Sequence, residues 1–129
     1  MDAFIKQNYP RFLDELKQFL AIPSVSAEPE RAQDVRKAAE WLAEALQRIG
    51  CSRVEILPTP GAPVVFADTG REEEAVTLLI YGHYDVQPVD PLEQWLSKPF
   101  TAEVREENLF ARGSSDMKGQ IEAVLGASE

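Results

Sequence analysis

Several residue types are scarce in this chain of 129 residues, and each scarcity excludes a class of protein. Cys51 is the only cysteine, so an internal disulfide is impossible and a reducing compartment is expected. No apolar run approaches the roughly 20 residues that a membrane-spanning helix needs. The amino terminus also lacks the basic stretch and apolar core of a secretory signal. These absences predict a cytoplasmic protein with no membrane partner.

Positive charge is also in short supply. The chain has 13 lysines and arginines against 22 aspartates and glutamates, a formal net charge of −9. Proteins that bind nucleic acid neutralise phosphates with clustered lysine and arginine, and no such cluster occurs here. Nucleic acid is therefore excluded as a partner. With 44% apolar and 27% charged residues, the composition is that of one ordinary globular domain.

Two segments near the amino terminus have the apolar spacing of amphipathic helices. The first covers residues 11–21 and ends before Pro23, because a residue that precedes proline is disfavoured in the α conformation. The second runs from Pro29, which the first turn of a helix tolerates, to Ile49, and Gly50 follows as a typical helix-ending residue. Both stripes predict helices that pack on a core.

The middle of the chain has the pattern of strands. Residues 75–81 are almost continuously apolar, which predicts an interior strand covered on both faces by helices. Further strands are expected at residues 53–57 and 64–67, a hairpin at residues 100–104 and 108–111, and a last helix from Lys118. This order predicts an α/β fold, a layered sheet with flanking helices.

The first candidate site lies just after the expected interior strand. His83 is the only histidine of the chain, and Asp85 follows two residues later. In an extended segment this spacing places both side chains on the same side. A carboxylate that accepts one ring N–H leaves the other nitrogen free for a metal. The alternative is a histidine that is merely satisfied by a neighbouring acid.

The second candidate is Asp116, in a loop between a strand and the last helix. Gly113 and Gly119 flank it, and they permit unusual backbone conformations and close packing. A carboxylate at the end of a strand can hold two metals with its two oxygens. The alternative is that Asp116 caps the helix that begins at Lys118.

Together these motifs resemble the aminoacylase and carboxypeptidase G family, and within it the carnosinase-type dipeptidases. The resemblance rests on residues 82–89 (Gly-His-Tyr-Asp-Val-Gln-Pro-Val), Trp95, Pro99-Phe100 and residues 112–119, and it extends to residues 22–26 between the opening helices. It implies a partial catalytic domain of a zinc-dependent exopeptidase-like fold.

The resemblance also implies a role for each candidate residue. His83 matches a ligand of one zinc, and Asp116 matches the carboxylate that bridges two zincs. Asp85 matches the catalytic-site aspartate that orients the histidine. In such a site the metals lower the pKa of a bridging water, and a glutamate carries the proton to the leaving amine. The implied substrate is a dipeptide or a small amide.

The chain departs from the family pattern because a second histidine and the family's glutamate pair are missing. We therefore expect residues 1–129 to be the amino-terminal portion of the catalytic domain, without its remainder and without the lid and dimerisation domain. Such a fragment is expected to be inactive and to self-associate, whereas the full-length parent would be a homodimer. Two alternatives stay open: a metal-free interaction module, and a half that complements a separate carboxyl-terminal chain.

Overall fold

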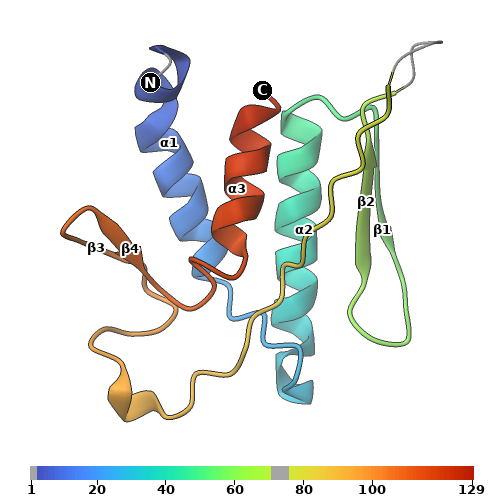
Figure 1. Ribbon diagram of the computed structural model, residues 1–129. Coiled ribbons are helices and arrows are strands. Elements are labelled where there is room, and N and C mark those ends of the chain that lie inside the picture. The colour runs from blue at the N-terminus through green and yellow to red at the C-terminus, as the bar shows by residue number, and fades with distance from the viewer. Residues whose placement is uncertain (1–2, 71–75) are drawn as a thin grey trace.

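The computed structural model describes residues 3–70 and 76–129. Their helices and strands follow in the order α1 (Ala3–Leu20), η1 (Pro29–Arg31), α2 (Ala32–Arg48), β1 (Arg53–Leu57), β2 (Val64–Asp68), η2 (Leu92–Gln94), β3 (Glu103–Arg105), β4 (Asn108–Phe110) and α3 (Lys118–Ala127). In Figure 1, α3 stands between α1 and α2, and the β1–β2 hairpin flanks α2. The chain is thus a mixed helix and strand structure, as predicted.

Both opening helices form, with boundaries that differ from the expected ones. The first begins earlier, since α1 starts at Ala3 and includes Pro10, whose missing N–H costs the helix one hydrogen bond. The second is preceded by the short 3-10 helix η1, which begins at Pro29. The α-helix α2 itself begins at Ala32. Gly50 follows the end of α2 with a φ of +94°, the conformation expected of a glycine after a helix.

The strands pair as two separate antiparallel hairpins. In the first, Arg53 lies opposite Asp68 and Leu57 opposite Val64. In the second, β3 and β4 pair around a two-residue turn. Both turn residues, Glu106 and Glu107, have positive φ, the pattern of the turns that match the twist of a hairpin. The second hairpin was predicted, and it is shorter than expected.

The core lies where α1 and α2 meet the segment that carries His83. Its buried members are Phe19, Val35, Ala38, Ala39 and Tyr84. The ring of Phe19 stacks on that of Trp41 from α2, with 4.3 Å between the ring centroids. The apolar faces of α1 and α2 therefore pack against each other. Through Tyr84, they also hold the segment that carries His83.

The expected interior strand is wrong for the residues that the structure describes. Residues 76–81 form no strand, and Figure 1 draws them as a plain trace. Val76, Leu78 and Leu79 are 97%, 80% and 88% exposed. An interior strand needs neighbours at both edges and on both faces, and the strands of residues 3–70 and 76–129 pair only with each other. Residue 75 of the predicted strand lies outside the described residues.

Within residues 3–70 and 76–129, none of the helices has the combination of length and apolar character that crossing a membrane would require.

Candidate functional site

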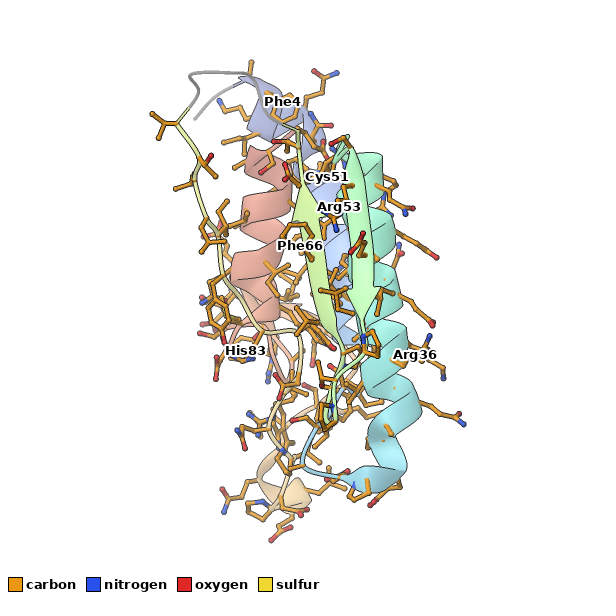
Figure 2. The ribbon with its side chains drawn as sticks, turned by 90° about the vertical axis from the view of Figure 1, so that its right-hand side faces the viewer. Phe4, Arg36, Cys51, Arg53, Phe66 and His83 are labelled. Carbon is orange, nitrogen blue, oxygen red and sulfur yellow. The ribbon has the colours of Figure 1, made fainter. Side chains whose placement is uncertain are left out.

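The three side chains singled out in the sequence lie together in the structure. His83 projects from the extended segment near the amino-terminal end of α3 (Figure 2). Its Nε2 atom is 3.0 Å from Oδ1 of Asp116. On the other side of the ring, Nδ1 is 3.1 Å from Oδ1 of Asp85 and 3.2 Å from the Asp85 carbonyl oxygen. The imidazole is thus held between two carboxylates from segments 31 residues apart in sequence.

The segment that carries His83 and Asp85 is fixed by the connector between α1 and η1. The Ser24 hydroxyl donates a 2.7 Å hydrogen bond to the carbonyl of Tyr84. The backbone N–H of Val86 donates to the carbonyl of Ser24 at 2.9 Å, and Val25 forms a parallel bridge with Val86. The short extended run that was expected around His83 therefore obtains its backbone partners from the connector.

The loop that carries Asp116 depends on its two glycines. Gly113 has a φ of +88°, and a Cβ there would lie 2.7 Å from a methyl carbon of Val86. A Cβ on Gly119 would lie only 2.2 Å from the carbonyl oxygen of Ser114. Neither position accepts a side chain without displacement, since real contacts of this kind are not that short. The glycines thus allow the loop to pack against the His83 segment.

Asp116 does not act as the helix cap that the sequence left open. The residue at the cap position of α3 is Met117, and no side chain makes a capping hydrogen bond there. The Asp116 carboxylate instead faces His83. Its side chain is 77% exposed, so one oxygen contacts the ring while the carboxylate stays accessible to solvent.

The electrostatics of the site favour a positive charge at His83. Burial disfavours the charged imidazolium, but the hydrogen bonds to Asp85 and Asp116 and the charges of these carboxylates outweigh it and raise the pKa of His83 above its usual value. A neutral ring whose Nε2 lone pair faced Asp116 would meet a negative charge. A proton or a metal ion between the two removes that repulsion.

Lys118 is a buried charged residue that the sequence analysis did not single out. Its side chain has no solvent exposure, and its ammonium donates to the carbonyls of Phe19 (2.9 Å) and Ile22 (2.8 Å). Burial lowers its pKa to about 7. The residue therefore ties the Asp116 loop to the end of α1. The sequence contained a sign of this burial: Lys118 lies on the same helical face as the apolar residues Ile121 and Leu125.

The residues present fit a transition metal in their donor chemistry and spacing. Imidazole nitrogen and carboxylate oxygen are common zinc ligands. Two ligands about 2.1 Å from one tetrahedral zinc would lie roughly 3.4 Å apart, and His83 Nε2 and Asp116 Oδ1 are 3.0 Å apart. Asp85 contacts Nδ1, the opposite ring nitrogen. It therefore supports the imidazole ring and is not a third ligand beside His83 Nε2 and Asp116. Among residues 3–70 and 76–129, no group of three or more acidic, histidine or cysteine side chains is arranged to hold a metal.

The loop that follows the site, around Trp95, has a structural role. The indole N–H of Trp95 donates to the carbonyl of Val89 at 2.9 Å. The guanidinium of Arg112 lies 5.0 Å from the centre of the indole ring and donates to the carbonyl of Pro88. These contacts hold residues 86–95 against the strand that leads to Asp116.

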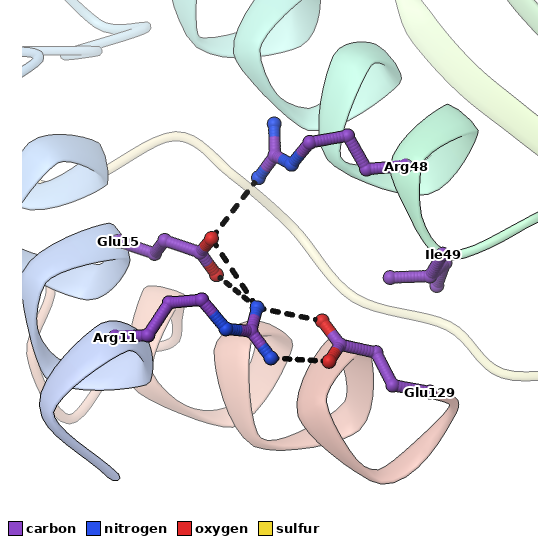
Figure 3. Close-up of a pocket in the computed structure, with 5 residues that line it drawn as sticks. All are labelled: Arg11, Glu15, Arg48, Ile49 and Glu129. Atoms are coloured by element: carbon purple, nitrogen blue, oxygen red, sulfur yellow. Dashed lines mark hydrogen bonds and ion pairs between the residues drawn. The ribbon is translucent and has the colours of Figure 1, made fainter. Parts of the chain in front are cut away.

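A second polar cluster lies away from His83, between the middle of α1 and the carboxyl-terminal ends of α2 and α3 (Figure 3). Arg11 pairs with Glu129 and Glu15, and Arg48 lies 3.7 Å from Glu15. With Ile49 these residues line a depression of about 410 Å³. Its charged groups pair with one another, so the cluster ties the three helices together. The His83 site remains the candidate for chemistry.

A histidine with one ring nitrogen on a supporting carboxylate and the other facing a second carboxylate has the arrangement of a metal-ligating histidine. The comparisons with known proteins define the class more narrowly. Residues 79–129, which include all three site residues, match the model of peptidase family M20/M25/M40.

Individual relatives agree with that match. The chain is 32% identical to the Cys-Gly metallodipeptidase DUG1 of Candida albicans, over 97% of this chain and 29% of that protein. It is 30% identical to the human Beta-Ala-His dipeptidase, over 96% of this chain and 27% of the relative. The resemblance stated from the motifs is therefore confirmed.

Solved structures show the same relationship. Human carnosine dipeptidase 1 superposes with a TM-score of 0.90 at 31% identity, and the dipeptidase Dug1p of Saccharomyces cerevisiae with 0.88 at 26%. Each match covers 97% of this chain and 29% of the other. The chain thus has the fold of the part of these dipeptidases that it matches, and it spans under a third of their length.

Proposed function

We propose that His83 and Asp116 bind a catalytic metal ion and that Asp85 is the catalytic-site carboxylate that orients His83. One observation carries this proposal: His83 Nε2 faces Asp116 Oδ1 at 3.0 Å while Asp85 occupies the Nδ1 side of the same ring. A purely structural histidine needs only one such partner. Two carboxylates on one exposed ring favour a site made for a cation.

Zinc is the metal that we propose, with two ions in the complete active site. Two of the relatives are named as metallodipeptidases, which supports a divalent metal, and a histidine with a carboxylate suits zinc. When bound, such metals polarise a carbonyl and supply hydroxide near neutral pH. Asp116 has one oxygen at His83 and 77% of its side chain exposed, which supports the proposal that it would bridge the two ions.

The reaction that we propose for the whole protein is hydrolysis of a dipeptide or a related small amide. The relatives are named as Cys-Gly and Beta-Ala-His dipeptidases, and one as a succinyl-diaminopimelate desuccinylase. Residues 1–129 would then be the amino-terminal portion of the catalytic domain. The remaining ligands and the proton-carrying glutamate would lie in the part of the relatives that this chain does not match.

The proposal also includes a location and a state of assembly. The single cysteine supports a reducing compartment such as the cytoplasm. The exposed apolar residues 76–81 support self-association of this chain, and a homodimer is proposed for a full-length parent. Neither nucleic acid nor a membrane is proposed as a partner, because the net charge of −9 disfavours contact with phosphates.

A chimera tests the function directly. Residues 1–129 would replace the segment that they match in the Candida albicans Cys-Gly metallodipeptidase, and Cys-Gly hydrolysis would be measured with added zinc. We expect zinc-dependent hydrolysis that falls at least about 100-fold with His83→Ala or Asp116→Ala, a loss in the range of general catalytic effects. Asp14→Asn, at an exposed position of α1, is the control and should leave the rate unchanged.

The chain by itself is expected to behave differently. Without further ligands, residues 1–129 should not hydrolyse Cys-Gly with or without zinc, because two protein ligands are fewer than a catalytic zinc site has. Turnover by the isolated chain that Asp116→Ala abolishes would show a complete site and contradict this part. A folded chimera whose hydrolysis does not depend on His83 would contradict the proposed function itself.

A further inference from the structure

Asp85 has a second partner that the motif does not contain. Its Oδ1 faces His83 Nδ1 at 3.1 Å, and its Oδ2 accepts a hydrogen bond from the hydroxyl of Ser26. The two oxygens of one carboxylate are thus engaged from opposite sides by residues 57 positions apart in sequence. A carboxylate with one free oxygen can rotate about its last bond, whereas a carboxylate held at both oxygens cannot.

The backbone around Ser26 is held firmly against the same segment. Ser24 is fully buried and bonds to Tyr84 through its hydroxyl and to Val86 through its carbonyl. Val25 forms the parallel bridge with Val86. This pairing sets the register of the connector, so that Ser26 lies beside Asp85. The hydroxyl is therefore placed by backbone bonds that do not depend on Ser26 itself.

The two sides of the imidazole ring differ in a way that decides where a single proton resides. On the Nδ1 side, both the carboxylate and the carbonyl of Asp85 accept, and the Asp85 side chain is 36% exposed. On the Nε2 side, the acceptor is Asp116, whose side chain is 77% exposed and more strongly screened by water. A neutral His83 thus has its stronger acceptor at Nδ1, provided that Asp85 stays in place.

We propose that Ser26 is a positioning residue: it holds the Asp85 carboxylate so that neutral His83 keeps its proton on Nδ1 and presents the Nε2 lone pair toward Asp116. This inference rests on the proposed function in one respect, since Nε2 is the atom assigned to the metal. It adds Ser26, from the α1–η1 connector, to the residues that orient the His83 ring and therefore its Nε2 atom. Metal ligands commonly depend on outer partners of this kind for their orientation.

The single histidine makes the proposal directly measurable. In metal-free chain at alkaline pH, long-range ¹H–¹⁵N correlation spectra report which ring nitrogen of His83 carries the proton. We expect mainly the Nδ1–H form in the wild type. Ser26→Ala should lower the ratio of Nδ1–H to Nε2–H by about threefold, an effect in the range of one net hydrogen bond. Asp85→Ala should lower it further.

Matched variants separate orientation from general stability. Ser26→Thr keeps the hydroxyl and should restore the wild-type ratio. Ser52→Ala removes another exposed hydroxyl that bonds to a carbonyl, that of Asp68, and should leave the ratio unchanged. A second readout is calorimetric zinc affinity, which Ser26→Ala should lower by about tenfold, as loss of an outer partner typically does.

Each outcome decides the matter. An unchanged ratio in folded Ser26→Ala, while Asp85→Ala shifts it, overturns the positioning role. A Ser26→Thr variant that behaves like Ser26→Ala also overturns it, because the hydroxyl would then not be the cause. The tautomer readout needs neither metal nor turnover. An inactive folded chimera together with an intact tautomer ratio would mean that the peptidase proposal fails. That result is distinguishable from a failure of the positioning role of Ser26, which the tautomer ratio alone would show.

Discussion

Glu122 lies on α3 with only 5% of its surface exposed. Among the described residues, no N–H or O–H group donates a hydrogen bond to either of its carboxylate oxygens. Glu122 can hydrogen-bond with the Glu15 carboxylate only when one of the two acids is protonated. Burial, followed by the negative charge of Glu15, raises its pKa to about 7, and Arg48 and Arg11 oppose this shift only in part. Glu122 is therefore a buried acid that is most compatible with the fold when it is protonated.

This acid gives the folded chain a defined pH dependence. The pKa rises from 4.5 in the unfolded state to about 7 in the folded state, so the contribution is fully present below pH 4.5 and is lost as the pH rises through 7. Glu122→Gln stays neutral at every pH. We expect it to match the wild type at pH 4 and to exceed its free energy of unfolding by about 3 kcal/mol at pH 8.

Chemical denaturation at the two pH values measures this difference. Glu44→Gln, at an exposed glutamate of α2, is the control and should show no such divergence. If the Glu122→Gln variant gained nothing between pH 4 and pH 8, the buried carboxyl would have to be ionised without cost, contrary to its surroundings.

Residues of the site differ in how far the sequence could predict them. The placement of His83 beside Asp85 follows from a spacing of two in an extended segment, and the structure shows that placement. Lys118 and Ser26 were not predicted, because their partners are far away in sequence: Lys118 bonds to a carbonyl 99 residues earlier. Only the fold brings such partners together. The catalytic roles of the site residues remain proposals.

At the scale of elements, local pattern predicted the helices well and one strand wrongly. The apolar stripes of α1 and α2 could be recognised locally. Each helix makes its backbone hydrogen bonds within itself and needs other segments only to cover its apolar face. The apolar run at residues 76–81 is different, since a strand obtains its hydrogen bonds and its burial from other segments. The described part of the chain supplies no such segment.

The exposed segment leads to a prediction about association. Leu78 and Ile80 are 80% and 54% exposed, and no charged residue occurs between residues 76 and 82. Exposed apolar segments with unpaired edges favour self-association. We therefore expect light scattering to show dimers or larger assemblies of the isolated chain, and Leu78→Lys with Ile80→Lys to return the mass to 14.4 kDa.

A control with the same change in charge isolates the effect of position. Gln33→Lys with Gln47→Lys adds two lysines at exposed sites of α2 and should leave the assemblies intact. A wild-type chain that stays monomeric at high concentration would contradict the association. Assemblies that both double variants abolish would assign it to net charge and not to the segment.

At the scale of the whole molecule, the fold is shared with proteins more than three times as long. A TM-score of 0.90 over 97% of this chain means that its backbone has the arrangement found in the matching part of human carnosine dipeptidase 1. In this chain, Lys118 bonds the Asp116 loop to the end of α1, and Ser24 bonds the connector to the segment that carries His83. The sequence alone predicted the α/β class, the motifs and the convergence of His83 with Asp116. It did not predict the contacts of Ser26 with Asp85 or of Lys118 with the end of α1.

The central claim is that His83 and Asp116 together form a metal site, and zinc titration followed at the His83 ring tests it most directly. Because the chain has one histidine, its ring resonances are unambiguous. Zinc should shift the Nε2 resonance while Nδ1 keeps its proton, with the weak affinity expected of two protein ligands, and Asp116→Ala should abolish the shift. A His83 ring that does not respond to zinc, or responds equally in Asp116→Ala, would contradict the claim.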